Sequence, residues 1–228
     1  MVFDEEPAAT AEPINELRRS YHDRISEVRR LSLGILGDAV VGVDAVSDSL
    51  VLSHSSRPPV VGFSPAEMQA RAAVVDSEIV ALLALESPVA RDLRVILSAR
   101  DVTQLAMLCI GLCQTLSERV ERISMALTEP LRRSVAEVAA GTLELLRSAQ
   151  GAWTTLDGGL AAAVVPQAAA VQVRQTELMR ALIGLEAVPM ETAMDLALLA
   201  RAFERLADHA VEIADRVHFA VQGTRLPA

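Results

Sequence analysis

An all-α fold, built as two tandem three-helix bundles with a pseudo-twofold repeat, is predicted by three features of this 228-residue sequence. No segment alternates polar and apolar residues as a half-buried strand does. Proline and glycine breaks divide the chain into segments whose apolar residues recur every three or four positions, the period of a helix. The sequence is 51% hydrophobic with few aromatic residues, which is typical of helices that pack through Ala, Leu and Val.

The breaks delimit six helices, expected at residues 13–52, 65–85, 88–126, 130–153, 160–185 and 189–223. Segment 53–65 is rich in proline and is predicted to be a loop. The next helix should begin at a capping box in which Ser64 precedes Pro65 and Glu67. Pro166 predicts a kink in the fifth helix. The expected organisation is therefore a disordered N-terminus, two bundles and a tail, at residues 1–12, 13–127, 128–223 and 224–228.

The two halves of the sequence are similar in layout. Each has a shorter middle helix, a proline break at Pro88 or Pro189, and a long final helix. When the final helices are aligned with an offset of 97 residues, three uncharged residues of the first half align with three carboxylates of the second. Met107, Gly111 and Thr115 align with Glu204, Asp208 and Glu212. This layout indicates a duplicated three-helix unit.

Charge and composition exclude several classes of protein. The net charge of −9 argues against general nucleic-acid binding, which needs a basic face. The N-terminus lacks a secretory pattern, and no apolar run is long enough for a membrane span. Cys109 and Cys113 lie on one helix face, and the sequence has no disulfide framework. The two cysteines are either buried structural thiols or ligands of a soft metal. A cytoplasmic location without membrane insertion is expected.

The helix at 189–223 carries four carboxylates on one stripe: Glu204, Asp208, Glu212 and Asp215. Like charges at this spacing repel by a few tenths of a kcal/mol per pair, so something should offset them. Hard cations prefer carboxylate oxygens, and this spacing lets two side chains converge on one ion. The alternative is a solvated face neutralised by Arg201, Arg205 and Arg216.

Three stretches resemble the PhoU family. PMETAMDLALLARAFERLADHAVEIADRV (189–217) is similar to the family's second signature, E-R-x-x-D-H-A-x-x-I-A. SPVARDLRVILSA (87–99) resembles its first signature, built around P-x-A-x-D-L-R. LRRSYHDR (17–24) resembles the opening of actinobacterial members.

The resemblance implies a negative regulator of phosphate-starvation signalling and phosphate uptake rather than an enzyme. Such a regulator couples the ATPase subunit of the Pst phosphate transporter to a sensor histidine kinase of a two-component system, and a homodimer is expected. The resemblance also implies a divalent or iron-type metal ion on E/D-x-x-x-D motifs of the final helix of each bundle. Glu204 and Asp208 match the second motif, with Glu212 and Asp215 as flanking candidates. Met107 and Gly111 replace the first motif, so one site is expected, in the second bundle.

Four further residues are expected to support that site or to face a partner: His209, Arg205, Asp92 and Arg94. His209 lies about 100° round the helix from Asp208, which favours a supporting or capping role over ligation. Asp92 and Arg94 form a candidate pair facing phosphate or a partner, since Arg suits phosphate geometry. The alternative is that Asp92 interacts with the helix dipole.

Two other functional classes stay open. One is a carboxylate-bridged metalloenzyme in a helical bundle, and the other is a metal-free helical adaptor. The sequence has no glycine-rich phosphate loop and no G-x-S-x-G motif. The regulator is the primary hypothesis.

Overall fold

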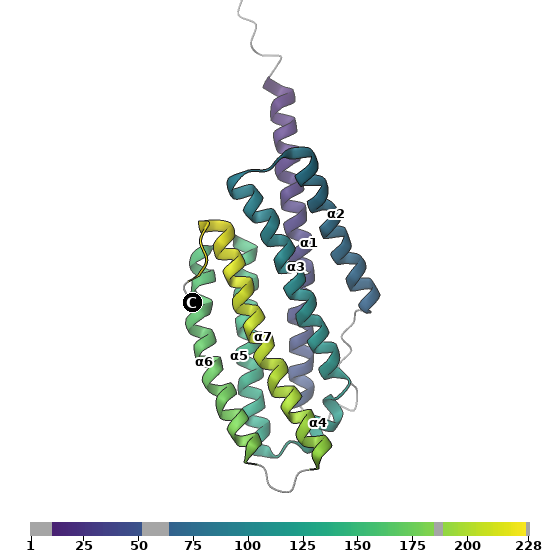
Figure 1. Cartoon of the computed structure of the whole chain (residues 1–228), viewed down its shortest axis with the longest axis vertical. Coiled ribbons are helices and arrows are strands. Elements are labelled where there is room, and N and C mark those ends of the chain that lie inside the picture. Colours follow the sequence, from purple (N-terminus) through teal and green to yellow (C-terminus); the bar gives the residue numbers. More distant parts are fainter. Residues whose placement is uncertain (1–10, 52–63, 185–188, 227–228) are drawn as a thin grey trace, which may run out of the picture.

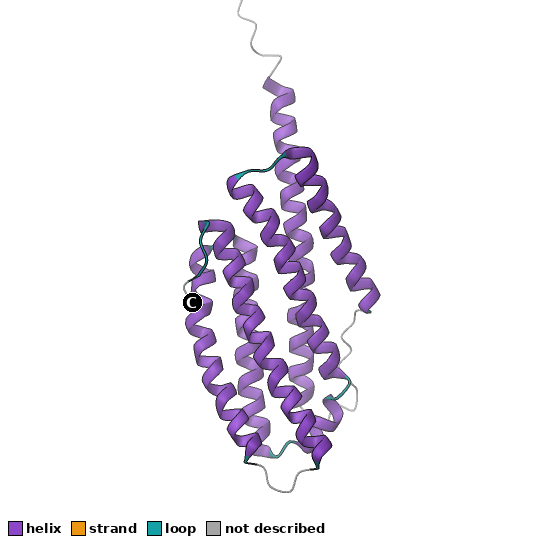
Figure 2. Ribbon diagram, in the orientation of Figure 1, coloured by secondary structure: helices purple, strands orange, loops and turns teal. Residues whose placement is uncertain are grey.

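The computed structural model describes residues 11–51, 64–184 and 189–226, with side chains from Arg18 onward. These residues form α-helices and no strand, which confirms the all-α class (Figure 2). The helices are α1 (Ala11–Val51), α2 (Pro65–Glu86), α3 (Ala90–Ser117), α4 (Val120–Ala126), α5 (Glu129–Thr155), α6 (Gly158–Ile183) and α7 (Met190–Gln222).

Two three-helix bundles make up the molecule, one from α1, α2 and α3 and the other from α5, α6 and α7 (Figure 1). In Figure 1, α2 and α6 lie at opposite sides, with the other long helices between them. Because α3 contacts α7 and α1 contacts α5, the buried residues of both bundles form one continuous core.

Burial repeats with the offset of 97 residues that the sequence predicts. Each buried residue of α3 between Ser98 and Leu116 has a buried counterpart in α7, from Asp195 to Ile213. Gly111 and Asp208 are both exposed, and Met107 and Glu204 are both half-buried. The two helices therefore occupy equivalent places in their bundles, and the acidic stripe exists on α7 alone.

Local signals set the helix ends. The Ser64 hydroxyl accepts a hydrogen bond from the Glu67 N–H (3.2 Å), and the Glu67 carboxylate accepts one from the Ser64 N–H (2.9 Å), which confirms the capping box. The Asp157 carboxylate accepts bonds from two N–H groups at the start of α6 (2.7 and 3.0 Å). Gly223 ends α7 at a φ of +80°, where a side chain would be strained. α6 continues through Pro166 as one helix.

The prediction of one continuous helix over residues 88–126 was wrong, because the structure divides this segment into α3 and α4. The Arg119 N–H bonds to the carbonyl of Leu116 (3.0 Å), three residues back, so the backbone tightens at the end of α3 and then restarts. This turn directs Arg119 and Arg122 toward α7. No proline or glycine marks the break in the sequence.

The predicted irregular segments lie mainly outside the described residues. Residues 1–10 of the predicted disordered N-terminus and residues 52–63 of the predicted loop are not described. Ala11 and Glu12 already belong to α1, so the predicted start of that helix was two residues late. The C-terminal tail is described as far as Leu226.

α3 is the described helix that is long and apolar enough to cross a membrane by length and composition. Its most apolar window is 56% buried inside the fold. α3 packs against both α1 and α7, and this burial accounts for its apolar composition, as in the core helix of a bundle.

Candidate functional site

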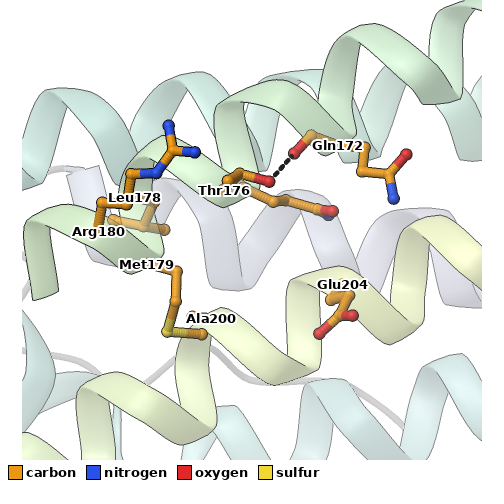
Figure 3. A pocket seen from close by; sticks show the side chains of 8 residues that line it. Gln172, Thr176, Leu178, Met179, Arg180, Ala200 and Glu204 are labelled. Carbon is orange, nitrogen blue, oxygen red and sulfur yellow. Dashed lines mark hydrogen bonds between the residues drawn. The ribbon is translucent and has the colours of Figure 1, made fainter. Parts of the chain in front are cut away.

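Glu204 lies on α7 at the edge of a cavity between α6 and α7 (Figure 3). Its carboxylate forms an ion pair with Arg201, one turn earlier, at 2.6 Å. The facing helix α6 contributes Gln172 and Gln175 to the same cavity. Glu204 is therefore a half-buried carboxylate with one arginine partner and neutral amides across from it.

Asp208 lies one turn further along α7 and is exposed. It makes no hydrogen bond or ion pair with any described residue. Partial desolvation and then the neighbouring Glu204 carboxylate raise the pKa of Asp208. His209 and Arg201 act in the opposite direction, and Glu212 adds to the rise. Burial and the neighbouring carboxylates therefore both disfavour the charged form of Asp208.

The outer two carboxylates of the stripe have other partners. Glu212 lies 3.7 Å from Nδ1 of His209. Asp215 forms an ion pair with Arg225 and accepts a hydrogen bond from the Leu226 N–H (2.8 Å), so it ties the C-terminal tail to α7. Asp215 is therefore not available to a site centred on Glu204 and Asp208.

His209 is 7% exposed, so its side chain is buried in the fold. Neither ring nitrogen has a hydrogen-bond partner among the described residues. Within the described part of the chain, His209 therefore caps no helix and supports no carboxylate by hydrogen bonding.

The arginines expected to neutralise the stripe do so only in part. Arg201 pairs with Glu204, but Arg216 lies 3.2 Å from Asp101 of α3. Arg205 is exposed and forms no ion pair with a described residue. The alternative of a face neutralised by three arginines therefore holds for Arg201 and not for Arg205 or Arg216.

The described residues do not complete a ligand set for a metal ion. They contain no group of three or more His, Cys, Asp or Glu side chains placed to hold one. Hard cations take six or more oxygen ligands, whereas this part of α7 offers two carboxylates, one already paired with Arg201. On α6, Glu177 does not line the cavity beside Glu204. A cation at this position would have to displace Arg201 and keep most of its water.

Asp92 and Arg94 bind the chain itself rather than facing outward as a pair. Asp92 accepts a hydrogen bond from the Tyr21 hydroxyl of α1 (3.0 Å), and burial together with this carboxylate raises the pKa of Tyr21 to about 12. Arg94 donates to the carbonyl of Phe219 at the end of α7 (3.2 Å). Both side chains hold the start of α3 in place.

Cys109 and Cys113 are free thiols buried in the core. Burial raises the pKa of both thiols, that of Cys113 to about 12, so both stay protonated at neutral pH. Their positions match the buried Leu206 and Ala210 of the second repeat. The structural interpretation of these cysteines fits the fold.

Asp195 is a feature that sequence reasoning missed. This carboxylate is 5% exposed and accepts hydrogen bonds from Arg122 (3.0 and 3.4 Å), while Arg119 lies 3.4 Å away. The sequence could have indicated this buried charge, because Asp195 lies four residues before Leu199 and so on the apolar stripe of α7. A charge on that stripe indicates a buried pair.

The second bundle matches the family model described as the PhoU domain, over residues 135–217. The phosphate-specific transport system accessory protein PhoU homolog 1 of Mycobacterium tuberculosis is 31% identical over 216 residues, which cover 91% of this chain and 95% of the relative. The chain belongs to the PhoU family.

Two further comparisons agree with membership of the PhoU family. PhoU homolog 2 of Mycobacterium tuberculosis is 29% identical over 212 residues, covering 91% of this chain and 99% of the relative. The crystal structure of PhoU from Pseudomonas aeruginosa matches with a TM-score of 0.81 at 21% identity, covering 90% of this chain and all of that one (100%). The family match includes Glu204, Asp208 and His209 of α7, whereas Asp92 and Arg94 lie outside it.

Proposed function

We propose that this PhoU-family protein is a cytoplasmic negative regulator of phosphate-starvation signalling and phosphate uptake. It couples the ATPase subunit of the Pst phosphate transporter to a sensor histidine kinase, and it acts by contact rather than by catalysis. The observation that carries the proposal is the 31% identity, over 95% of its length, to a relative named an accessory protein of the phosphate-specific transport system.

The outward face of α7 supports a role in contacts. Arg205 and Asp208 are both exposed within the E-R-x-x-D stretch, and neither pairs with another described residue. Unpaired charges of opposite sign on a rigid helix give a partner protein orientation and specificity. A homodimer is also proposed, and light scattering on the purified protein tests it.

Deletion of the protein tests the regulatory proposal. In high phosphate the deletion strain should express phosphate-scavenging enzymes and the transporter as if starved, and the wild-type gene should restore repression. Arg205→Glu combined with Asp208→Arg should fail to restore it, whereas Arg174→Glu on α6 should succeed. Normal repression in a strain that also lacks any second family member would overturn the proposal.

A metal-free adaptor is the second candidate, favoured by the ion pair between Arg201 and Glu204. In that case the regulator acts through its helix surfaces alone. Binding of a metal at Glu204 and Asp208 stays a proposal, which metal titration distinguishes from the adaptor.

A further inference from the structure

A cavity of about 300 Å³ opens between α6 and α7 (Figure 3). Buried or partly buried apolar side chains contribute to its wall, namely Leu178, Met179 and Ala200. Its size is at the lower end of the range for small-molecule sites, and it is larger than a single ion needs. An apolar wall with a few polar groups is the usual composition of such sites.

Two polar side chains of the cavity are already fixed by the protein. The Gln175 amide donates to the carbonyl of Phe203 on α7 (3.2 Å), which bridges the two helices. The Thr176 hydroxyl donates to the carbonyl of Gln172 (2.9 Å). The Gln172 amide makes no hydrogen bond with a described residue, so it is available to a ligand.

The charges of the cavity lie at opposite ends. Arg180 is exposed and pairs with no carboxylate in the described part of the chain, and Figure 3 shows it on the far side of the cavity from Glu204. Glu204 and the neighbouring Asp208 repel an anion from their end. An anionic group would therefore bind at Arg180, whose guanidinium matches both phosphate and carboxylate.

We propose that this cavity binds a small hydroxylated organic anion. Its phosphate or carboxylate group pairs with Arg180, its hydroxyl groups bond to Gln172 and Glu204, and its carbon skeleton lies on Leu178 and Met179. The proposal does not depend on the regulatory role, because binding is measured on the purified protein. Its failure would leave the result of the deletion experiment unchanged.

Isothermal titration with four probes tests the proposal: glucose 6-phosphate, gluconate, glucose and inorganic phosphate. At least one of the two hydroxylated anions should bind more tightly than both glucose and inorganic phosphate. Arg180→Gln should weaken that binding about tenfold or more, the scale of a lost charge-assisted hydrogen bond. Glu204→Gln should weaken it less, since an amide oxygen still accepts from a hydroxyl.

Arg174→Gln is the matched control, since Arg174 is an exposed arginine of α6 outside the cavity. It should bind the anion as the wild type does, and circular dichroism should show all variants folded. Binding of neither hydroxylated anion would overturn the proposal. Equal binding by wild type and Arg180→Gln would overturn it as well.

Discussion

Arg119 and Arg216 lie at opposite ends of the contact between α3 and α7, and each forms an ion pair across it. Nε of Arg119 lies 3.4 Å from Asp195, and Nε of Arg216 lies 3.2 Å from Asp101. The two arginines are 97 positions apart, so they are the same residue of the repeated unit. Their partners come from the opposite helix in each case, as expected where two equivalent helices pack across a pseudo-twofold axis.

The two ends differ at the repeat-equivalent residues Ser98 and Asp195. The Ser98 hydroxyl donates to the carbonyl of Arg216 (3.0 Å), whereas Asp195 accepts hydrogen bonds from Arg122. One end is thus held by a buried carboxylate, and the other by a neutral hydrogen bond together with the partly exposed ion pair between Arg216 and Asp101. The end at Asp195 also fixes α4 against α7, because Arg122 belongs to α4.

Asp195→Ala should destabilise the protein. The substitution removes hydrogen bonds to a buried carboxylate, so it should cost about 2 kcal/mol and lower the Tm by about 4–8 °C. Glu191→Ala is the control, because Glu191 also contacts Arg122 but is exposed, and it should change the Tm little. A thermal melt of Asp195→Ala that matches the wild type would show that this cluster contributes nothing.

Asp208→Asn should stabilise the protein at neutral pH. Because the pKa of Asp208 is raised in the folded state, the folded protein holds this proton to a higher pH than the unfolded chain does. Stability from this group therefore falls as the pH rises from the unfolded pKa, about 3.9, through the folded pKa. The urea midpoint of the variant should exceed that of the wild type at neutral pH and approach it near pH 3. A lower midpoint at neutral pH would mean that Asp208 is stabilising as an ion.

Arg201→Gln should strengthen any binding of a cation at Glu204 and Asp208, because Arg201 forms an ion pair with Glu204 that competes with the cation. Millimolar Mn²⁺ should therefore raise the Tm of this variant more than that of the wild type. Glu204→Gln combined with Asp208→Asn should abolish the rise. If Mn²⁺ shifts neither the wild type nor Arg201→Gln, the stripe holds no cation and the metal-free adaptor is the correct account.

Cys109 and Cys113 should react with a thiol reagent only after unfolding. Both are fully buried, and their raised pKa values leave little thiolate. Release of the coloured product from Ellman's reagent should be slow in the native protein and immediate in denaturant. Fast reaction of the native protein would show that the contact between α3 and α7 opens readily.

Local signals made most of the fold predictable. Ser64, Pro88 and Gly223 mark helix ends by their own backbone chemistry, so the sequence suffices for them. The break at Arg119 carries no such residue and arises where that arginine meets α7. Long-range packing of this kind is absent from local sequence.

The candidate site was predictable in position but not in pairing. Helical spacing places Glu204 and Asp208 on one stripe, and the structure keeps them there. Which arginine neutralises them depends on the helix that packs alongside, so Arg216 turned out to pair with Asp101 of α3. Arg94 bonds to α7 for the same reason.

Affinity capture from phosphate-replete cells tests the proposed coupling most directly. The tagged protein, cross-linked in the cell, should enrich the Pst ATPase subunit and a sensor histidine kinase. Arg205→Glu combined with Asp208→Arg should lose at least one of them, while Arg174→Glu should retain both. Enrichment of neither protein above the level seen with an unrelated tagged helical bundle would contradict the account.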